Sequence, residues 1–324
     1  MITATQHFID ANGIRLHAVE SGKGPLVLLL HGFPETSHVW RHQLAALSDA
    51  GFRAIAPDLR GFGFSDCPAK MEQYTTIDVI GDLVGLLDSV GERHAVVVGN
   101  DWGAAVAWQA ATLRPDRFRA VVALGVPLMN RAPMAPSQLF PQTDRMWFYT
   151  HYFSQLGLAE AELERDVESS LRKIYFSASG DVGPRDERSP NPFGLVKRQR
   201  GYLEELHDFS SLPVWLAPND LDALVRAFLR SGFRGGLNYY RNLDRNWEMQ
   251  AAFEGRTLKV PSLFLVGERD TGLLMPGMLD IIDAIPKLAP HHRGSHVVPH
   301  VGHWLQQEAP AHVNALLIDF LRHL

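Results

Sequence analysis

The chain has 324 residues, of which 46% are hydrophobic and 21% charged, and its formal net charge is −5. This length and composition suffice for a large buried core, and they favour a globular enzyme over a disordered or membrane protein. The charge is mild and forms no block of one sign, which argues against a nucleic-acid or anionic-membrane partner. The single cysteine, Cys67, excludes an internal disulfide, and residues 1–10 lack the pattern of a signal peptide. We therefore expect a cytoplasmic protein.

Strand and helix patterns alternate over the first 124 residues. Two partly alternating runs around Asn12-Gly13 predict a β-hairpin, and an apolar run at 26–30 predicts a strand buried on both faces. The later patterns predict a helix at 39–50, a strand at 52–56, a helix at 76–90, strands at 96–98 and 120–124, and a helix at 106–111 between those strands. This alternation implies an α/β protein with a mostly parallel, doubly wound sheet, in which ligands bind at the carboxyl ends of the strands.

The alternation stops near residue 127 and returns near residue 260. The intervening segment predicts amphipathic helices at 161–176, 219–230 and 241–252, a surface loop at 177–200, and no convincing buried strand. Strands at 260–266 and 294–298 and a helix at 310–324 close the chain. We therefore expect a core domain formed by residues 1–133 and 253–324, with residues 134–252 inserted as a helical lid.

A strand–turn–helix pattern is centred on Asp101. The turn Gly99-Asn100-Asp101-Trp102-Gly103 resembles a nucleophile elbow in which a carboxylate stands where an esterase has serine. A carboxylate there suggests attack on a saturated carbon. Small residues at 99 and 103 suit a turn in which backbones crowd together and Asp101 adopts a strained conformation. An alternative is that Asp101 only caps the helix that follows.

Asp101, Asp270 and His303 occur in the chain order nucleophile, acid and base, each just after a predicted strand. This is the order found in the α/β-hydrolase fold, and the strand-end positions bring all three to one edge of the sheet. His303 is the expected general base, because an imidazole can take a proton from water near neutral pH. Asp270 is expected to orient its ring. The alternatives are a histidine at a helix start and an aspartate in a turn.

The loop at residues 31–34 follows the first buried strand and supplies a candidate oxyanion hole. Because Pro34 has no N–H, we assign the hole to the backbone N–H groups of Phe33 and Trp102. Five histidines lie between residues 291 and 303, but no cysteine or carboxylate set accompanies them at zinc-site spacing. We therefore expect neither a metal nor a cofactor.

Four motifs together resemble the soluble epoxide hydrolases of the α/β-hydrolase superfamily. They are His31-Gly32-Phe33-Pro34-Glu35, Asp101-Trp102-Gly103, Gly267-Glu268-Arg269-Asp270 and Gly302-His303-Trp304. Residues 231–242 also resemble the lid segment that carries one of the family's two epoxide-activating tyrosines, which implies Tyr240. The other tyrosine lies early in the lid in a Tyr-x-x-Tyr-Phe context, which implies Tyr149, with Tyr152 as second choice.

The resemblance also implies roles around these residues. Glu35 is expected to bind the hydrolytic water, or only to lie in its loop, and Pro34 to contact substrate or water. Trp147 and Leu237 are expected to line an apolar pocket together with Phe33 and Trp102. One departure is Asn100, because the family often has histidine before the nucleophile.

These residues predict conversion of an epoxide to a vicinal diol through an ester of Asp101. Carboxylate attack on an epoxide generates an alkoxide, and two neutral phenols can donate hydrogen bonds to it. The expected partners are a small hydrophobic epoxide and water, and the chain is expected to be a monomer or homodimer. A haloalkane dehalogenase is the nearest alternative, but that family typically has a halide-binding asparagine where Phe33 stands. An inactive hydrolase-fold binding protein is a further alternative, against which the complete triad argues.

Overall fold

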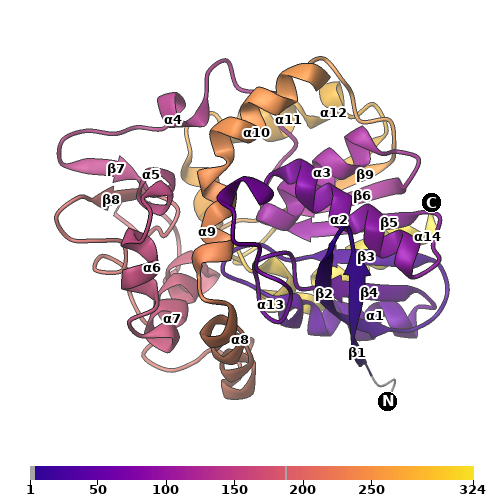
Figure 1. Ribbon diagram of the computed structural model, residues 1–324, viewed down its shortest axis with the longest axis horizontal. Helices are drawn as coiled ribbons and strands as arrows, with labels where there is room; N and C mark the ends of the chain where they lie inside the picture. The colour runs from indigo at the N-terminus through magenta and orange to yellow at the C-terminus, as the bar shows by residue number, and fades with distance from the viewer. Residues whose placement is uncertain (1–3, 187) are drawn as a thin grey trace.

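The computed structural model describes residues 4–186 and 188–324, and its centre is an eight-stranded sheet (Figure 1). The strand order is β1-β2-β4-β3-β5-β6-β9-β10. Strand β2 pairs antiparallel with both β1 and β4, and the other neighbours in the sheet are parallel. The strands are β1 (Thr5–Ala11), β2 (Ile14–Ser21), β3 (Leu26–Leu30), β4 (Arg53–Pro57), β5 (Ala95–Asn100), β6 (Phe118–Leu124), β9 (Ser262–Gly267) and β10 (His292–Val298).

The predicted hairpin and buried strands are confirmed. Asn12 and Gly13 have φ angles of 50° and 77°, and the flanking residues Ala11 and Ile14 pair directly. Two consecutive residues with positive φ are what a tight hairpin turn requires, and Asn-Gly adopts them readily. Every residue of β3 and β5 is buried, because these central strands are covered on both faces.

Helices cover both faces of the sheet. Right-handed crossovers place α1 (Arg41–Asp49), which follows β3, on the face opposite α2 (Thr76–Ser89) and α3 (Trp102–Leu113), because the chain reverses its direction across the sheet after β4. Helix α14 (Pro310–Arg322) packs beside α1, and α2 packs beside α3. The short helices α11 (Met278–Asp283) and α12 (Ile285–Leu288) connect β9 to β10. The doubly wound α/β sheet that the alternation predicts is therefore confirmed.

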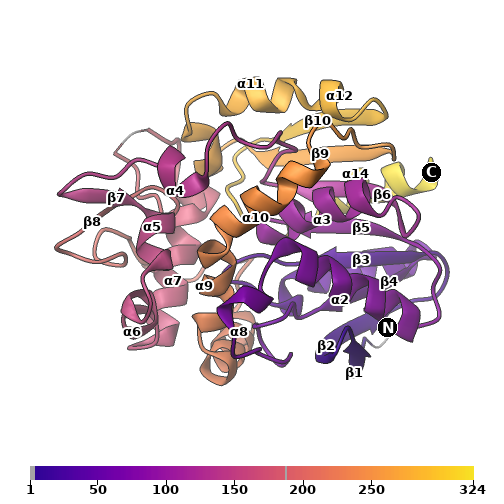
Figure 2. The same ribbon diagram turned by 45° about the horizontal axis from the view of Figure 1, so that its top comes forward.

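Helices are the main regular structure of the segment between β6 and β9. It contains α4 (Pro136–Leu139), β7 (Met146–Phe148), α5 (Tyr149–Ser154), α6 (Leu158–Leu163), α7 (Val167–Ala178), β8 (Leu195–Lys197), α8 (Pro218–Ser231), α9 (Arg234–Arg241) and α10 (Leu243–Gln250). Elements α4 to α8 gather on one side of the sheet, at the left of both views (Figures 1 and 2). Across the described ranges, no helix is long and apolar enough to cross a membrane.

Three local predictions within this segment are wrong. The single helix predicted at 161–176 is two helices, because Asp166 ends the apolar period and accepts the N–H of Ser169 as the N-cap of α7. The helix predicted at 241–252 is divided at Asn242, between α9 and α10. The predicted surface loop at 177–200 contains β8, which pairs antiparallel with β7, and it also contains the buried Phe193.

Candidate active site

Asp101 occupies a strained turn between β5 and α3. Its φ and ψ angles are 53° and −121°, which non-glycine residues rarely adopt. The neighbouring glycines are required by close packing, because a Cβ at Gly99 would lie 2.1 Å from the Gly103 carbonyl oxygen and one at Gly103 would lie 2.0 Å from the Leu30 oxygen. The Asp101 side chain makes no hydrogen bond to the N-terminus of α3, so the helix-cap alternative is wrong.

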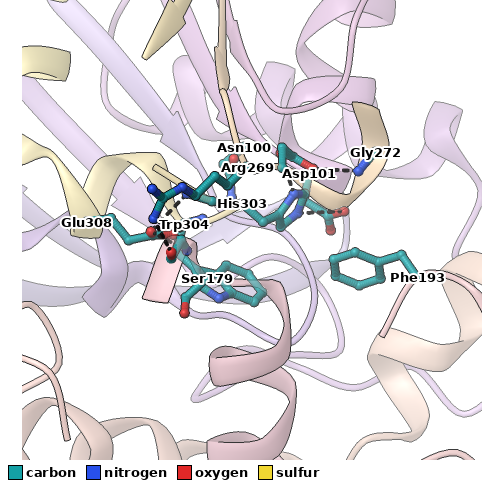
Figure 3. Close-up of polar contacts among 12 residues, drawn as sticks. Asn100, Asp101, Ser179, Phe193, Arg269, Gly272, His303, Trp304 and Glu308 are labelled. Atoms are coloured by element: carbon teal, nitrogen blue, oxygen red, sulfur yellow. Dashed lines mark hydrogen bonds and ion pairs between the residues drawn. The ribbon is translucent and has the colours of Figure 1, made fainter. Parts of the chain in front are cut away.

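The structure brings Asp270 and His303 to this turn, and Figure 3 shows His303 beside Asp101. The His303 Nδ1 lies 2.9 Å from Asp270 Oδ2, and the other oxygen of Asp270 accepts the Gly272 N–H at 2.8 Å. The His303 Nε2 lies 3.6 Å from Asp101 Oδ2 and has no hydrogen-bond partner among the described residues. Both Asp270 and His303 are buried. In this arrangement Nε2 is directed at the Asp101 carboxylate. A water molecule that attacks an ester of Asp101 would lie within reach of this nitrogen.

The charges around His303 decide its protonation. Burial lowers the pKa of His303, but the carboxylates of Asp270 and Asp101 outweigh burial and hold this pKa well above its usual value. Both carboxylates therefore favour the charged form of the imidazole while Asp101 is free. If Asp101 became an ester, one of these stabilising charges would disappear and His303 would release its proton more readily.

The Asp101 carboxylate also meets the loop that follows β3. The backbone N–H of Phe33 donates to Asp101 Oδ1 at 2.8 Å. Trp102, the other predicted residue of the oxyanion hole, is the first residue of α3 and follows Asp101 directly. Among the described residues, the backbone N–H that donates to this carboxylate is that of Phe33. The predicted oxyanion-hole residues therefore lie on the two segments that meet at Asp101.

Two tyrosines from the inserted segment lie over this turn. Tyr149 begins α5 and Tyr240 lies on α9, and their ring centroids are 5.6 Å apart. The Tyr240 ring packs edge-on against Trp102 and Phe33, with centroid distances of 5.2 Å and 5.6 Å. Its hydroxyl is buried and has no hydrogen-bond partner among the described residues. Burial, reinforced by the Asp101 charge, raises the pKa of both phenols, so both are neutral and can donate a proton.

Tyr152 lies on the same helix as Tyr149 but has a different environment. Its hydroxyl donates to the Glu162 carboxylate, which also accepts the Tyr202 N–H at 2.9 Å. The Tyr152 hydroxyl is thus held within the inserted segment, whereas the charge of Asp101 acts on the Tyr149 phenol. The environment favours Tyr149 over Tyr152 as the first phenol of the site.

Glu35 is buried beneath the strained turn. Its carboxylate accepts the Gly32 N–H at 3.2 Å, the Asn100 side-chain amide at 3.3 Å and the side-chain amides of Gln306 and Gln307 at 2.8 Å and 3.4 Å. Burial outweighs these donors and raises the pKa of Glu35 to about 7. Asn100, which stands where the family often has histidine, therefore supports the turn through Glu35.

Leu237 and Pro34 lie on the segments that carry Tyr240 and Phe33, whereas Trp147 contacts Arg198 and Tyr152 of the inserted segment. Leu237 is fully buried on α9, and the Pro34 carbonyl accepts the Tyr175 hydroxyl at 3.4 Å. Trp147 lies on β7 with the guanidinium of Arg198 4.3 Å from its ring. The sequence interpretation missed Phe193, whose ring centroid lies 4.9 Å from that of His303. The sequence feature that indicates Phe193 is that it is an aromatic residue in an otherwise polar segment.

Fold and site together define an α/β hydrolase, and the sequence profile of the alpha/beta hydrolase fold family matches residues 25–310. Epoxide hydrolase A of Mycobacterium tuberculosis is 42% identical over 323 residues, which cover 99% of this chain and 98% of that protein. Epoxide hydrolase 2 of Siraitia grosvenorii is 39% identical over 97% of each chain. An epoxide hydrolase from an endophytic Streptomyces has a TM-score of 0.92 and 40% identity, covering 98% of this chain and 95% of its own. The chain therefore belongs to the epoxide hydrolase family of the α/β-hydrolase superfamily.

Proposed function

We propose that the chain converts a small hydrophobic epoxide to a vicinal diol through a covalent ester of Asp101. The observation that carries this proposal is Tyr240, whose ring packs against Trp102 beside the nucleophile and whose buried hydroxyl has no hydrogen-bond partner among the described residues. A buried unpaired donor is destabilising, so its presence beside a carboxylate supports a role toward an oxygen that arrives with the substrate. An esterase or a dehalogenase has no need of such a phenol.

In the first step an Asp101 oxygen attacks one epoxide carbon. The new C–O bond forms as the strained C–O bond of the ring breaks, and the electron pair of that bond goes to the epoxide oxygen. Tyr149 and Tyr240 donate hydrogen bonds to this oxygen as its charge develops, and a proton from one of them gives the alcohol. The high pKa of each phenol supports this role, because both are neutral before attack.

In the second step water attacks the Asp101 carbonyl carbon. His303 takes the proton of this water at Nε2, while Asp270 holds the ring at Nδ1 and stabilises the resulting imidazolium. The oxyanion that forms is stabilised by the N–H groups of Phe33 and Trp102. As this intermediate collapses, the bond to the alkyl oxygen breaks, that oxygen takes the proton from the His303 imidazolium, and the diol leaves. The second proton of the attacking water, left on the Asp101 carboxyl, passes to the tyrosinate from the first step, which restores both the carboxylate and the phenol without a cofactor.

The inserted segment and the residues around Asp101 have supporting roles in this mechanism. Residues 134–252 serve as a lid on the core formed by 1–133 and 253–324, since both phenols come from this insertion. Pro34, Trp147 and Leu237 contact the substrate or its water, and Glu35 holds the hydrolytic water through its loop. The protein acts in the cytoplasm as a monomer or homodimer.

The experiment compares two products. The purified protein is incubated with styrene oxide and, separately, with a bromoalkane, and diol and halide are measured. We expect diol without halide. Halide release without diol would favour a haloalkane dehalogenase, and the absence of both products would favour an inactive hydrolase-fold binding protein.

A further inference from the structure

Residues of the inserted segment reach under the loop that carries His303. Gly180, which follows α7, donates its N–H to Glu308 Oε2 at 2.8 Å, and its carbonyl accepts Arg269 Nη1 at 2.8 Å. Arg269 directly precedes Asp270, and Glu308 ends α13 (Leu305–Glu308), which follows His303. One glycine of the insertion is therefore bonded to both loops of the triad.

The Glu308 carboxylate accepts three backbone N–H groups at once, and Figure 3 shows Glu308 beside Trp304. Besides Gly180, it accepts the Gly302 N–H at 2.9 Å and the Trp304 N–H at 3.0 Å, and these two residues flank His303. The His303 N–H donates to the Ala178 carbonyl at 2.9 Å. The N–H groups of residues 302–304 are therefore all fixed by groups outside their own loop.

The contact between the two segments leaves no space for side chains. A Cβ at Gly180 would lie 2.2 Å from the His300 carbonyl oxygen, and one at Gly302 would lie 2.4 Å from the Gly180 nitrogen. Neither glycine has the positive φ that would itself require glycine. Glycine is therefore required at both positions because the two backbones approach closely. This close packing restricts the position of the loop that carries His303.

Arg185 holds the rest of this segment in place. Its guanidinium donates to the carbonyl groups of Arg269, Ser177, Ser179 and Pro190, at distances of 2.9, 2.7, 2.7 and 2.8 Å. These bonds connect Ser177, Ser179 and Pro190 to the loop of Asp270 through one side chain. Phe193, three residues beyond Pro190, then lies on the His303 ring.

We propose that Glu308, acting with Gly180, is a positioning residue that fixes the His303 imidazole for hydrolysis of the ester and not for its formation. The proposal rests on the epoxide hydrolase function proposed above. Ester formation needs Asp101 and the phenols, none of which Glu308 contacts. Ester hydrolysis needs His303 Nε2, whose position follows from the backbone N–H groups that Glu308 holds. A displacement near 1 Å slows a well-oriented step by about 10²-fold.

Two variants disturb this contact in different ways. Glu308→Gln places an amide N–H₂ against one of three backbone donors, whereas Gly180→Ala keeps the carboxylate but separates the two segments. Glu268→Gln is the matched control, because Glu268 is exposed and accepts the His300 N–H at 2.8 Å, whereas the N–H groups of residues 302–304 donate to Glu308 and Ala178. All variants are studied at pH 8, since burial raises the pKa of Glu308 to about 7 and its carboxyl is mostly ionised there.

Rapid-quench mass spectrometry with styrene oxide measures formation and decay of the Asp101 ester. We expect both variants to form the ester at a rate within about twofold of wild type and to hydrolyse it about 10²-fold more slowly, so that it accumulates, while Glu268→Gln behaves as wild type. A proportional loss of both rates, or no change in either, would overturn the proposal.

A second measurement does not depend on activity. Titration of the His303 imidazole by NMR is expected to show a lower pKa in Gly180→Ala than in wild type, because this variant keeps the Glu308 charge while the imidazole moves away from Asp270. An unchanged imidazole pKa in a folded variant would overturn the positioning role. Absence of any ester in wild type would instead contradict the proposed function, and the imidazole titration would then decide the positioning role alone.

Discussion

Replacement of Tyr240 by phenylalanine is expected to raise stability while it lowers activity. The Tyr240 hydroxyl is buried, and among the described residues it has no hydrogen-bond partner. Tyr240→Phe removes this unpaired group and retains the ring that packs on Phe33 and Trp102. The folded protein loses a desolvated donor, whereas the transition state for ring opening loses a hydrogen bond.

The two effects have different sizes. An unpaired buried hydroxyl costs about 1–3 kcal/mol, so its removal is expected to raise the free energy of unfolding by about 1 kcal/mol. For a chain of this length that corresponds to a Tm increase of about 2 °C. Loss of one donor to a developing oxyanion costs about 3–4 kcal/mol, which corresponds to a decrease in the ring-opening rate of about 10²–10³-fold.

The adjacent residue provides a control. The Tyr239 hydroxyl is also buried but donates to the Arg60 carbonyl at 3.1 Å. Tyr239→Phe is therefore expected to lower the free energy of unfolding by about 1 kcal/mol and to leave the ring-opening rate within about twofold of wild type. Calorimetry and single-turnover kinetics measure the two quantities for both variants. A lower Tm in Tyr240→Phe, or an unchanged ring-opening rate, would refute the reasoning.

Three further outcomes are expected. Asp270→Asn removes the charge that holds His303 Nδ1 at 2.9 Å. Rapid-quench measurements should show that ester hydrolysis slows by about 10²–10⁴-fold and that ester formation slows less. An equal loss in both steps would contradict this expectation. Asp101→Asn removes one of the charges that raise the pKa of His303. NMR titration should therefore give a lower imidazole pKa than in wild type. An equal or higher pKa would contradict the effect of the Asp101 charge on His303. Gly103→Ala would place its Cβ 2.0 Å from the Leu30 carbonyl oxygen, so chemical denaturation should show a loss of about 3 kcal/mol, whereas an unchanged midpoint would show that the turn has room.

The core could be predicted from the sequence because each of its strands has a strong local signal. The apolar run at 26–30 is β3 with the same bounds, and the final predicted helix matches α14 within two residues. The positions of Asp101, Asp270 and His303 followed from one physical rule, namely that the carboxyl ends of parallel strands meet at one edge of the sheet. Their convergence therefore required no knowledge of the side-chain contacts.

The insertion could not be predicted equally well because its structure depends on distant partners. Strands β7 and β8 have three residues each, which is too short for an alternating pattern to be recognised. Phe193 is buried against His303, which lies 110 positions further along the chain. The charged residues Arg185 and Glu308 are typical of a solvated surface in sequence, and only the fold reveals that backbone groups surround them.

A single turnover in water enriched in heavy oxygen tests whether Asp101 forms an ester. Enzyme in excess over styrene oxide is allowed to react once, after which the peptide that contains Asp101 and the diol are both analysed by mass spectrometry. The proposed mechanism predicts heavy oxygen in the Asp101 carboxylate and almost none in the diol, because water attacks the carbonyl carbon of the ester. Heavy oxygen in the diol with an unlabelled Asp101 would show that water attacks the epoxide directly, and it would contradict the covalent mechanism.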